Sequence, residues 1–305
     1  MKICDLHCHS TFSDGTLSPS ELVALAVRRG ISALALTDHN TSGGLGEFVR
    51  AGKEHGLITV PGCEFSTEHE GHEVHVVGLF FDEKAWPEIE DFVEHMHEAK
   101  RYANRKMIAA LAADGYDVTY EEAAALTETG DFNRAHVARV LLEKGQVKSV
   151  ADAFATILAE GAGYYVPARK LSSIATISFI RLYGAVAVLA HPFLNFDEEG
   201  LTRFLPEAKK AGLNAIETSY TEFTREQTAL AEELADRFGL LRSGGSDFHG
   251  STKPDIMLGC GRGGMEVPFE YYEKLANAAR NERHFNRKGR GRGSLRSQLG
   301  IRNEE

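Results

Sequence analysis

The chain has 305 residues, of which 26% are charged and 43% hydrophobic, and its formal net charge is −10 at pH 7. This length can bury the core of one large domain or two smaller ones, and the ordinary composition is that of a soluble globular protein. The longest apolar runs are far too short to span a bilayer, which excludes a transmembrane protein.

The N-terminal residues lead directly into a histidine-rich motif and leave no room for a signal peptide. The four cysteines form no C-x-x-C pair and nothing indicates an exported chain, so we expect reduced thiols. Both observations predict a cytoplasmic protein, with no membrane attachment and no evident obligate protein partner.

Seven short apolar runs are expected to form strands. Most are rich in Val, Ile and Leu without clean polar alternation, which is typical of parallel strands buried on both faces. The runs cover residues 3–6, 33–37, 57–60, 74–80, 185–190, 214–218 and 240–243.

Helical patterns lie between these strands. Ser18, Pro19 and Glu21 predict a helix start, because they supply a capping residue, a proline for the first turn and a capping-box carboxylate. Residues 201–211 and 224–238 also have apolar side chains at helical spacing. Repeated strand–helix units predict an α/β fold, and seven strands indicate a closed or nearly closed barrel.

One region interrupts this alternation and has only helical signals. They cover residues 89–111, 120–126, 134–143 and 150–158. We therefore expect a helical insertion domain at 83–172, within a discontinuous barrel of residues 1–82 and 173–282. Because a short loop would suffice there, we expect the insertion to act as a lid over the mouth of the active site.

The C-terminal segment 283–305 differs in charge from the rest of the chain. It holds seven Lys/Arg and two Glu, so the first 282 residues carry a net charge of −15. Its Arg/Gly-rich composition predicts disorder, either as a solubilising end without a partner or as a segment that contacts RNA phosphates. The acidic body would repel polyanions, so a phosphate substrate would require local cations, for which metal ions are the obvious candidates.

A histidine or a carboxylate follows, ends or lies within each predicted strand, and Glu217 ends the sixth. Because the carboxyl ends of parallel barrel strands meet on one face, where active sites are built, these side chains should converge. Imidazole and carboxylate together suit Zn²⁺, Mn²⁺ or Fe²⁺ rather than Ca²⁺ or Mg²⁺ alone. The candidate metal ligands are His7, His9, Asp14, His39, Glu64, His75, His191, Asp247 and His249.

Some members of this set have alternative interpretations. His7 and His9 lie two residues apart on an extended chain, so both rings can meet one ion. His191, which precedes a proline, is also compatible with a core histidine. Asp38 either ligates an ion itself, or caps the turn or orients the ring of His39 without contacting the ion.

Arg134 and His136 begin a predicted helix inside the insertion. Such side chains at a helix N-terminus suit a phosphate, but a solvated first turn explains them equally well, and both interpretations stay open. Arg169 is a further basic residue of the same kind. Gly43-Gly44 would offer backbone N–H groups to a phosphate at another helix start.

Together these motifs resemble the PHP (polymerase and histidinol phosphatase) superfamily. The resemblance covers residues 1 to about 260 and consists of Asp5-Leu6-His7-Cys8-His9-Ser10 with Asp14, Thr37-Asp38-His39-Asn40, Gly62-Cys63-Glu64, His75, Ala190-His191-Pro192 and Ser246-Asp247-Phe248-His249-Gly250. It implies a distorted (β/α)7 barrel and a site for two or three divalent ions, with Mn²⁺ first and Fe²⁺ or Zn²⁺ as alternatives.

The resemblance also implies how the ligands divide among the ions. One ion would take His7, His9, Glu64 and Asp247, a second would share Glu64 and take His75 and His191, and a third would take Asp14, His39 and His249.

Within the superfamily, the motifs Asn133-Arg134-Ala135-His136 and Tyr165-Val166-Pro167 resemble the bacterial TrpH/YciV-like branch. Members of this branch remove the 3′-phosphate from nucleoside 3′,5′-bisphosphates, and some degrade short RNA from its 5′ end. The resemblance implies that the substrate is a phosphorylated nucleotide or a short oligonucleotide, and that Arg134 and His136, with Arg169, contact its phosphate.

The resulting hypothesis is a metal-dependent phosphatase that hydrolyses phosphomonoesters of nucleotides with a metal-bridging hydroxide. Asp247, His249 and His191 are the expected catalytic residues, and either histidine would protonate the leaving alkoxide. A histidinol-phosphate phosphatase is the nearest alternative. A non-catalytic RNA-binding protein with a vestigial barrel is the alternative of another class, and the complete ligand set argues against it.

Overall fold

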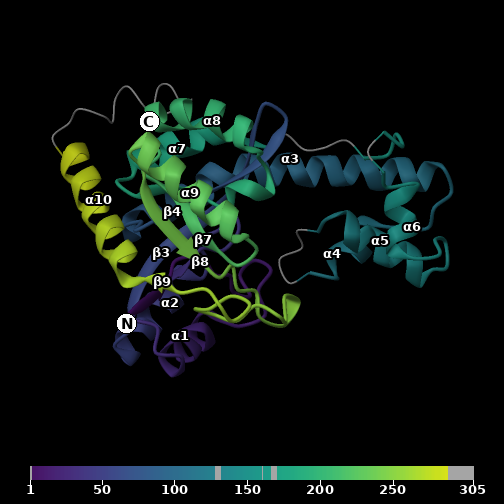
Figure 1. Cartoon of the computed structure of the whole chain (residues 1–305). Coiled ribbons are helices and arrows are strands. Elements are labelled where there is room, and N and C mark those ends of the chain that lie inside the picture. Colours follow the sequence, from purple (N-terminus) through teal and green to yellow (C-terminus); the bar gives the residue numbers. More distant parts are fainter. Residues whose placement is uncertain (1, 128–131, 160, 166–169, 288–305) are drawn as a thin grey trace, which may run out of the picture. The chain divides into compact units, whose positions relative to one another are not determined.

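The computed structural model describes residues 2–127, 132–159, 161–165 and 170–287 (Figure 1). The chain forms two compact units, the first from Met1–Asp91 and the chain from Leu171 onward, the second from Phe92–Lys170. The sequence places the corresponding boundaries at residues 83 and 172, whereas the first boundary in the structure falls inside a long helix, α3 (Trp86–Ala113).

Strands and helices alternate along most of the first unit. Its strands are β1 (Ile3–Asp5), β2 (Ala33–Leu36), β3 (Ile58–His69), β4 (His72–Leu79), β5 (Leu171–Ser172), β6 (Val186–Leu189), β7 (Ala215–Tyr220), β8 (Leu241–Gly245) and β9 (Val267–Pro268). Its helices, besides the start of α3, are α1 (Pro19–Arg28), α2 (Leu45–His55), α7 (Ser173–Leu182), α8 (Glu198–Ala211), α9 (Arg225–Phe238) and α10 (Phe269–Arg287). All seven predicted strands are present, and the predicted capping box starts α1 at Ser18.

The strands form one sheet in the order β8-β7-β6-β4-β3-β2-β1-β9. β1, β2 and β3 are parallel neighbours, as are β6, β7 and β8. β4 runs antiparallel to both β3 and β6, so the expectation of parallel strands throughout is wrong at this strand. The cause is local, because Glu70 and Gly71 join β3 to β4 and both have positive φ (50° and 81°), the requirement of a tight two-residue hairpin turn.

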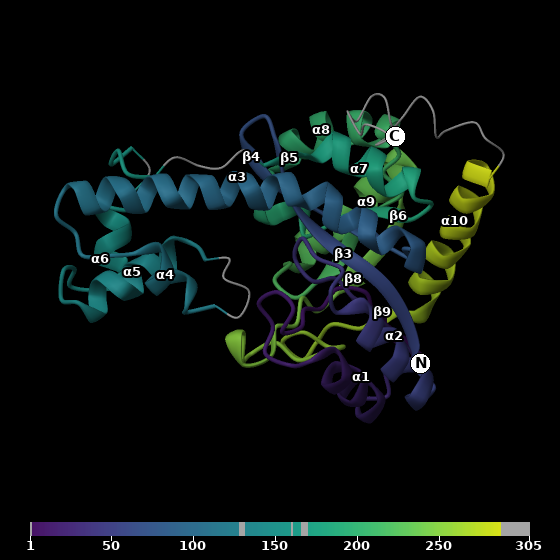
Figure 2. The ribbon, with the colours of Figure 1, turned by 180° about the vertical axis from the view of Figure 1, so that it is seen from behind.

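The two ends of the sheet meet between β1 and β8. The backbone N–H of Leu6 donates to the carbonyl of Gly244 (3.1 Å), and the N–H of Asp247 donates to the carbonyl of His7 (2.9 Å). The long strand β3 joins the two halves of the sheet (Figure 2). The result is a nearly closed barrel, which confirms the predicted α/β barrel class and brings the segments after β1 and β8 together.

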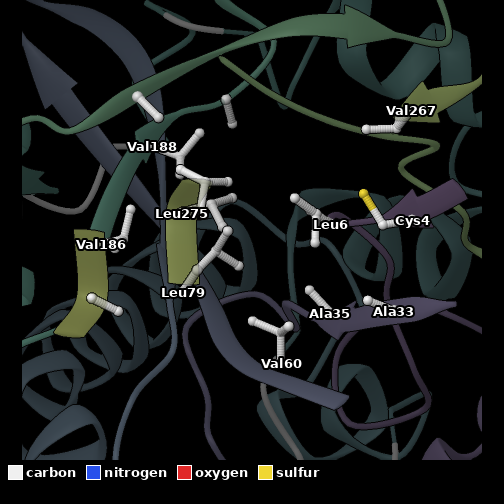
Figure 3. Close-up of a cluster of buried hydrophobic side chains, with 14 residues drawn as sticks. Cys4, Leu6, Ala33, Ala35, Val60, Leu79, Val186, Val188, Val267 and Leu275 are labelled. Carbon is white, nitrogen blue, oxygen red and sulfur yellow. The ribbon is translucent and has the colours of Figure 1, made fainter. Parts of the chain in front are cut away.

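Apolar side chains from several strands fill the barrel (Figure 3). Leu6, Val60, Leu79 and Val188 belong to four different runs of chain and are at most 1% exposed. Leu275 of α10, a helix that the sequence patterns do not predict, packs against the same cluster. Because this cluster includes the first residues of β6 and β7, α10 covers the end of the barrel where strands begin and leaves the opposite end for a site.

The second unit contains only helices as regular elements among its described residues. They are most of α3, α4 (Tyr120–Ala124), α5 (Arg134–Glu143) and α6 (Val150–Ala155). These helices coincide with the four predicted helical segments, and they share a core in which Met107, Leu111, Phe132 and Leu141 are fully buried. The function of this unit as a lid stays a prediction.

The C-terminal helix α10 extends to Arg287, so residues 283–287, which the sequence predicts to be disordered, are helical. Residues 288–305, with the Arg/Gly-rich run, lie outside the described residues. All four cysteines are free, and three of them are buried. In the described ranges, no helix is both long and apolar enough to cross a bilayer.

Candidate metal centre

The nine candidate ligands converge in the first unit. Segments directly after β1, β2, β6 and β8 carry most of them, as the sequence predicts. Glu64 and His75 lie instead within β3 and β4. In the hairpin register Glu64 is opposite Val77, so His75 is its diagonal neighbour on the same face of the sheet. The antiparallel hairpin that departs from the barrel pattern therefore brings this carboxylate and this imidazole together.

Glu64 is the centre of the cluster and is fully buried. Its Oε2 atom lies 3.1 Å from His7 Nε2 and 3.2 Å from His9 Nε2. Its Oε1 atom lies 2.8 Å from His75 Nδ1 and 2.9 Å from His191 Nε2. Each carboxylate oxygen thus faces at least two imidazoles, which is an arrangement that suits a carboxylate between two ions.

Asp247 completes a first ligand set with His7, His9 and Glu64. Its Oδ1 atom lies 3.1 Å from His9 Nε2 and 3.5 Å from His7 Nε2. The four ligand atoms lie within 4.8 Å of one another, and all four residues are buried. This is the set that the family resemblance assigns to a single ion.

Asp14 belongs to a second set, with His9, His39 and His249. Asp14 Oδ1 lies 3.3 Å from His249 Nε2, and Oδ2 lies 3.8 Å from His39 Nε2. The side chain of Asp14 is 52% exposed, so this set opens to solvent, unlike the first. The resemblance implies Asp14, His39 and His249 here, and the structure adds His9.

A third set consists of His39, Glu64 and His75. His39 Nδ1 lies 3.3 Å from Glu64 Oε2, on the same carboxylate that His75 faces. The resemblance pairs His75 with His191 at this place, whereas the structure brings His39 into the set. Imidazole and carboxylate donors so close together fit divalent transition-metal ions.

Three ring nitrogens of the cluster are buried without a hydrogen-bond partner among the described residues: His9 Nε2, His39 Nδ1 and His191 Nδ1. A buried polar atom without a partner costs about 1–3 kcal/mol, so proteins seldom leave one unsatisfied. His9 Nε2 and His39 Nδ1 both face the carboxylate of Glu64. A cation between these atoms would satisfy both, which is independent support for the fit to metal ions.

The carboxylates and imidazoles shift one another's pKa values. Burial alone would lower the pKa of His9 and His75, but the neighbouring carboxylates, Asp247 above all for His9 and Glu64 for His75, raise both to about 9. Burial lowers the pKa of His39 to about 4. Without metal, protons therefore supply part of the positive charge that the carboxylates require.

Glu217, which is 1% exposed, supports the cluster without belonging to a predicted ligand set. Its Oε1 atom accepts a hydrogen bond from His7 Nδ1 (2.8 Å), and its Oε2 atom accepts one from the backbone N–H of His191 (2.7 Å). With the proton on Nδ1, the Nε2 lone pair of His7 is directed at Glu64. The signal in the sequence is the position of Glu217 at the end of the sixth predicted strand.

Two further buried carboxylates, Asp38 and Asp5, hold the loops of the site. Asp38 accepts from the N–H of Ser10 (2.7 Å) and from the hydroxyls of Ser10 (2.6 Å) and Ser13 (2.7 Å), so it positions the loop after His9. These contacts favour a structural role for Asp38 in the turn, because they fix the loop after His9 and not the ring of His39. Asp5 accepts from both the N–H and the hydroxyl of Ser246 and thereby ties β1 to the segment after β8.

Two ligands have backbone conformations that few non-glycine residues adopt, His191 with φ 26° and Asp247 with φ 54°. Such residues concentrate at functional sites. Gly245 allows a close approach nearby, because a Cβ atom at this position would lie 2.4 Å from His7 Cβ. Glycine at the end of β8, two residues before Asp247, is therefore a requirement of the site's packing.

The predicted phosphate contacts lie in the second unit. The guanidinium of Arg134 stacks on the ring of Tyr165, with its central carbon 3.9 Å from the ring centroid. His136 is the third helical residue of a capping box, in which the backbone N–H of Asn133 donates to its Nδ1 (3.2 Å). The helix start therefore accounts for this nitrogen of His136. Arg169 lies outside the described residues.

The helix start at Gly43-Gly44 is occupied by a carboxylate of the chain itself. Gly44 caps α2. Glu90 accepts hydrogen bonds from the N–H and hydroxyl groups of Ser42 and from the hydroxyl of Thr41. A negative charge already fixed beside this helix start disfavours a second anion, so the phosphate site expected at Gly43-Gly44 gains no support and stays a prediction.

The chain matches known proteins along most of its length. The family model described as "PHP domain" matches residues 5–166. The 5′-3′ exoribonuclease Rnm of Escherichia coli K12 is 33% identical over 290 residues, which cover 92% of this chain and 97% of that protein. The 3′,5′-nucleoside bisphosphate phosphatase of Chromobacterium violaceum is 33% identical over 247 residues, which cover 80% of this chain and 86% of that protein.

A solved structure agrees with these sequence matches. A chain from Chromobacterium violaceum, described as an amidohydrolase with bound sulfate and no metal, has a TM-score of 0.73 and 31% sequence identity. The match covers 90% of this chain and 96% of that chain. The similarity therefore extends over both compact units.

Proposed function

The chain belongs to the PHP domain family and is a metal-dependent phosphoesterase, and from this premise we propose that it removes the 3′-phosphate from nucleoside 3′,5′-bisphosphates. The buried cluster around Glu64, with its three overlapping ligand sets, carries the proposal. The similarity to a nucleoside bisphosphate phosphatase over 86% of that protein supports the substrate class.

We propose that the three ligand sets hold two or three divalent ions, Mn²⁺ first and Fe²⁺ or Zn²⁺ as alternatives. The buried set would hold one ion, and the sets around Asp14 and His75 would hold the others. When bound, such ions supply positive charge to the phosphoryl oxygens and a nucleophile at neutral pH.

The residues of the chain keep this cluster in one arrangement. Glu217 holds the Nδ1 proton of His7 and the backbone of His191. The Nδ1 atom of His249 donates to the carbonyl of Asp247 (2.8 Å), which directs its Nε2 atom at Asp14. Whichever of His191 and His249 does not bind an ion through Nε2 is the proposed proton donor to the leaving oxygen, because each ring points Nε2 into the cluster. Asp247 completes the proposed catalytic residues.

Arg134, His136 and Arg169 are the proposed contacts of the second phosphate of the substrate. The stacked guanidinium of Arg134 supports this role, because a planar, preordered group loses little side-chain entropy when it binds a phosphate. A substrate with two phosphates should accordingly be preferred over one with a single phosphate.

A second candidate activity is the trimming of short RNA from its 5′ end, which the name of the Escherichia coli relative favours. Histidinol phosphate and a non-catalytic RNA-binding function are the remaining alternatives. The non-catalytic function predicts less than one metal ion per chain, whereas the ligand sets predict two or three ions.

Release of inorganic phosphate from three phosphomonoesters and release of mononucleotides from a short RNA, all measured in the presence of Mn²⁺, separate these activities. We expect adenosine 3′,5′-bisphosphate to be hydrolysed with a higher kcat/KM than adenosine 5′-monophosphate, histidinol phosphate or a short 5′-phosphorylated RNA. A preference for the RNA would replace the proposal by the exoribonuclease activity. No turnover, combined with elemental analysis below one metal per chain, would overturn the enzymatic proposal altogether.

A further inference from the structure

Lys253 lies beside the metal cluster and has no part in the mechanism proposed above. Its Nζ atom lies 2.8 Å from Asp247 Oδ2. The other oxygen of this carboxylate, Oδ1, is the one that faces His7 and His9. The carboxylate of Asp247 thus lies between the ammonium group of Lys253 and the two histidines of the buried ligand set.

Asp247 does not depend on Lys253 to hold its outer oxygen. The hydroxyl of Tyr220 donates to the same Oδ2 atom (2.9 Å) from a position that is 5% exposed. The side chain of Lys253 is 37% exposed and reaches this oxygen from the solvent side. An ammonium has three donors, so the bond to Asp247 leaves two for a ligand that arrives from solvent.

The segment that carries Lys253 is fixed against the loop of another ligand. The N–H of Ser251 donates to the hydroxyl of Thr16 (2.9 Å), and the hydroxyl of Thr252 donates to the carbonyl of Asp14 (3.4 Å). Lys253 is therefore held close to the solvent-open set of Asp14 as well as to the buried set of Asp247.

Lys253 lies in a strongly negative environment. Asp14, Glu64, Glu217 and Asp247 bring four carboxylates together in a chain whose net charge is −10. Within the described ranges, Lys253 is the one Lys or Arg with an ion pair to any of these four. An anionic substrate gains most from a cation placed where the surrounding field is otherwise negative.

We propose that Lys253 binds the phosphate that is hydrolysed, with its ammonium bridging Asp247 Oδ2 and a phosphate oxygen. The inference rests on the proposed phosphoesterase function and deepens it by adding a substrate-binding residue in the first unit. A compact ammonium suits this role, because lysine binds phosphate as a point charge and its flexible stem follows the ligand.

Calorimetric titration of inorganic phosphate into the Mn²⁺-loaded full chain tests the inference, with metal content measured in parallel. Lys253→Met should weaken phosphate binding by roughly 10- to 100-fold, the factor expected for a charge-assisted hydrogen bond, at unchanged metal content. Lys253→Arg should recover most of the affinity. Lys53→Met, on the exposed face of α2, is the matched control and should bind phosphate like the wild type.

Two results would overturn the inference. In the first, Lys253→Met binds phosphate as tightly as the wild type does. In the second, its loss of phosphate binding disappears once metal content is restored, and Lys253 then only positions Asp247. Tyr220→Phe is the comparison for a residue that only positions Asp247. This variant should lower the affinity for metal more than the affinity for phosphate.

The failure of the inference and the failure of the proposed function can be told apart. If adenosine 3′,5′-bisphosphate is hydrolysed and Lys253→Met keeps the wild-type KM and phosphate affinity, the function stands and the inference falls. If no phosphoester is hydrolysed but Lys253→Met still weakens phosphate binding, Lys253 is a phosphate-binding residue, whereas the proposed function falls and with it the statement that this phosphate is hydrolysed. A wild-type chain that is loaded with Mn²⁺ and binds no phosphate overturns the inference.

Discussion

Glu217 joins two segments of the metal cluster, His7 and His191, through its two carboxylate oxygens. Oε1 lies 2.8 Å from the imidazole Nδ1 of His7, and Oε2 lies 2.7 Å from the backbone nitrogen of His191. The first contact fixes a tautomer, and the second fixes the backbone at a residue with φ 26°. One buried carboxylate therefore controls both a ring and a main-chain conformation in the cluster.

We expect Glu217→Gln to weaken the metal site while the barrel stays folded. The amide oxygen of glutamine can still accept one hydrogen bond, but its NH2 group cannot accept the other, so a buried donor of His7 or His191 loses its partner. This should cost about 1–3 kcal/mol of the free energy of unfolding and about 10- to 100-fold in metal affinity. Urea unfolding and calorimetric titration with Mn²⁺ measure the two effects.

The control for this variant is Glu233→Gln, which makes the same chemical change on the exposed side of α9. It should leave both quantities within error of the wild type. Equal metal affinity in Glu217→Gln and the wild type would show that Glu217 does not orient the cluster.

Gly245→Ala should destabilise the chain, because the added methyl group would lie 2.4 Å from the Cβ and the backbone nitrogen of His7. Overpacking of this kind costs about 1–3 kcal/mol. Gly264→Ala is the matched control, since a Cβ atom there meets no atom within 4 Å. Urea midpoints of the two variants provide the comparison, and a Gly245→Ala midpoint no lower than that of Gly264→Ala would contradict the close approach.

Metal binding to the metal-free chain should release protons. Burial opposes the charged forms of His9 and His75, but the neighbouring carboxylates raise the pKa of each to about 9, so both rings carry a second proton and a positive charge at pH 7. An incoming cation must displace these protons, so the apparent affinity for Mn²⁺ should rise from pH 7 and level off above about pH 9. Calorimetry in buffers of different ionisation enthalpy counts the protons, and an affinity independent of pH would count against this coupling.

Much of the barrel follows from the sequence, because most of its strands contain runs of apolar residues that a buried environment stabilises. The direction of β4 does not, since an apolar run looks the same in a parallel and an antiparallel strand. The deciding signal is the short turn at Glu70 and Gly71, where the chain adopts positive φ twice. The sequence patterns also miss α10. Its apolar residues are recognisable as a buried helix face only once the barrel end that they cover is known.

The cluster shows a similar limit. The types of the ligands and their positions at strand ends predict which side chains come together, and the structure brings these together. That His39 also joins Glu64 and His75 in one set depends on side-chain directions that no spacing encodes. The contacts of Tyr220 and Lys253 with Asp247 depend on how separate loops fold back on the site, which is a property of the tertiary structure.

Asp247→Asn is the sharpest test of the cluster, because it removes the charge and keeps the shape. Asp247 has φ 54°, a region that asparagine tolerates and alanine does not, so the variant should fold normally. Its amide cannot replace a carboxylate that faces His7 and His9, so phosphate release should fall at least about 100-fold. The measurement follows metal stripping and Mn²⁺ re-addition, with circular dichroism as the check on folding. A wild-type rate at wild-type metal content would place the chemistry elsewhere in the chain.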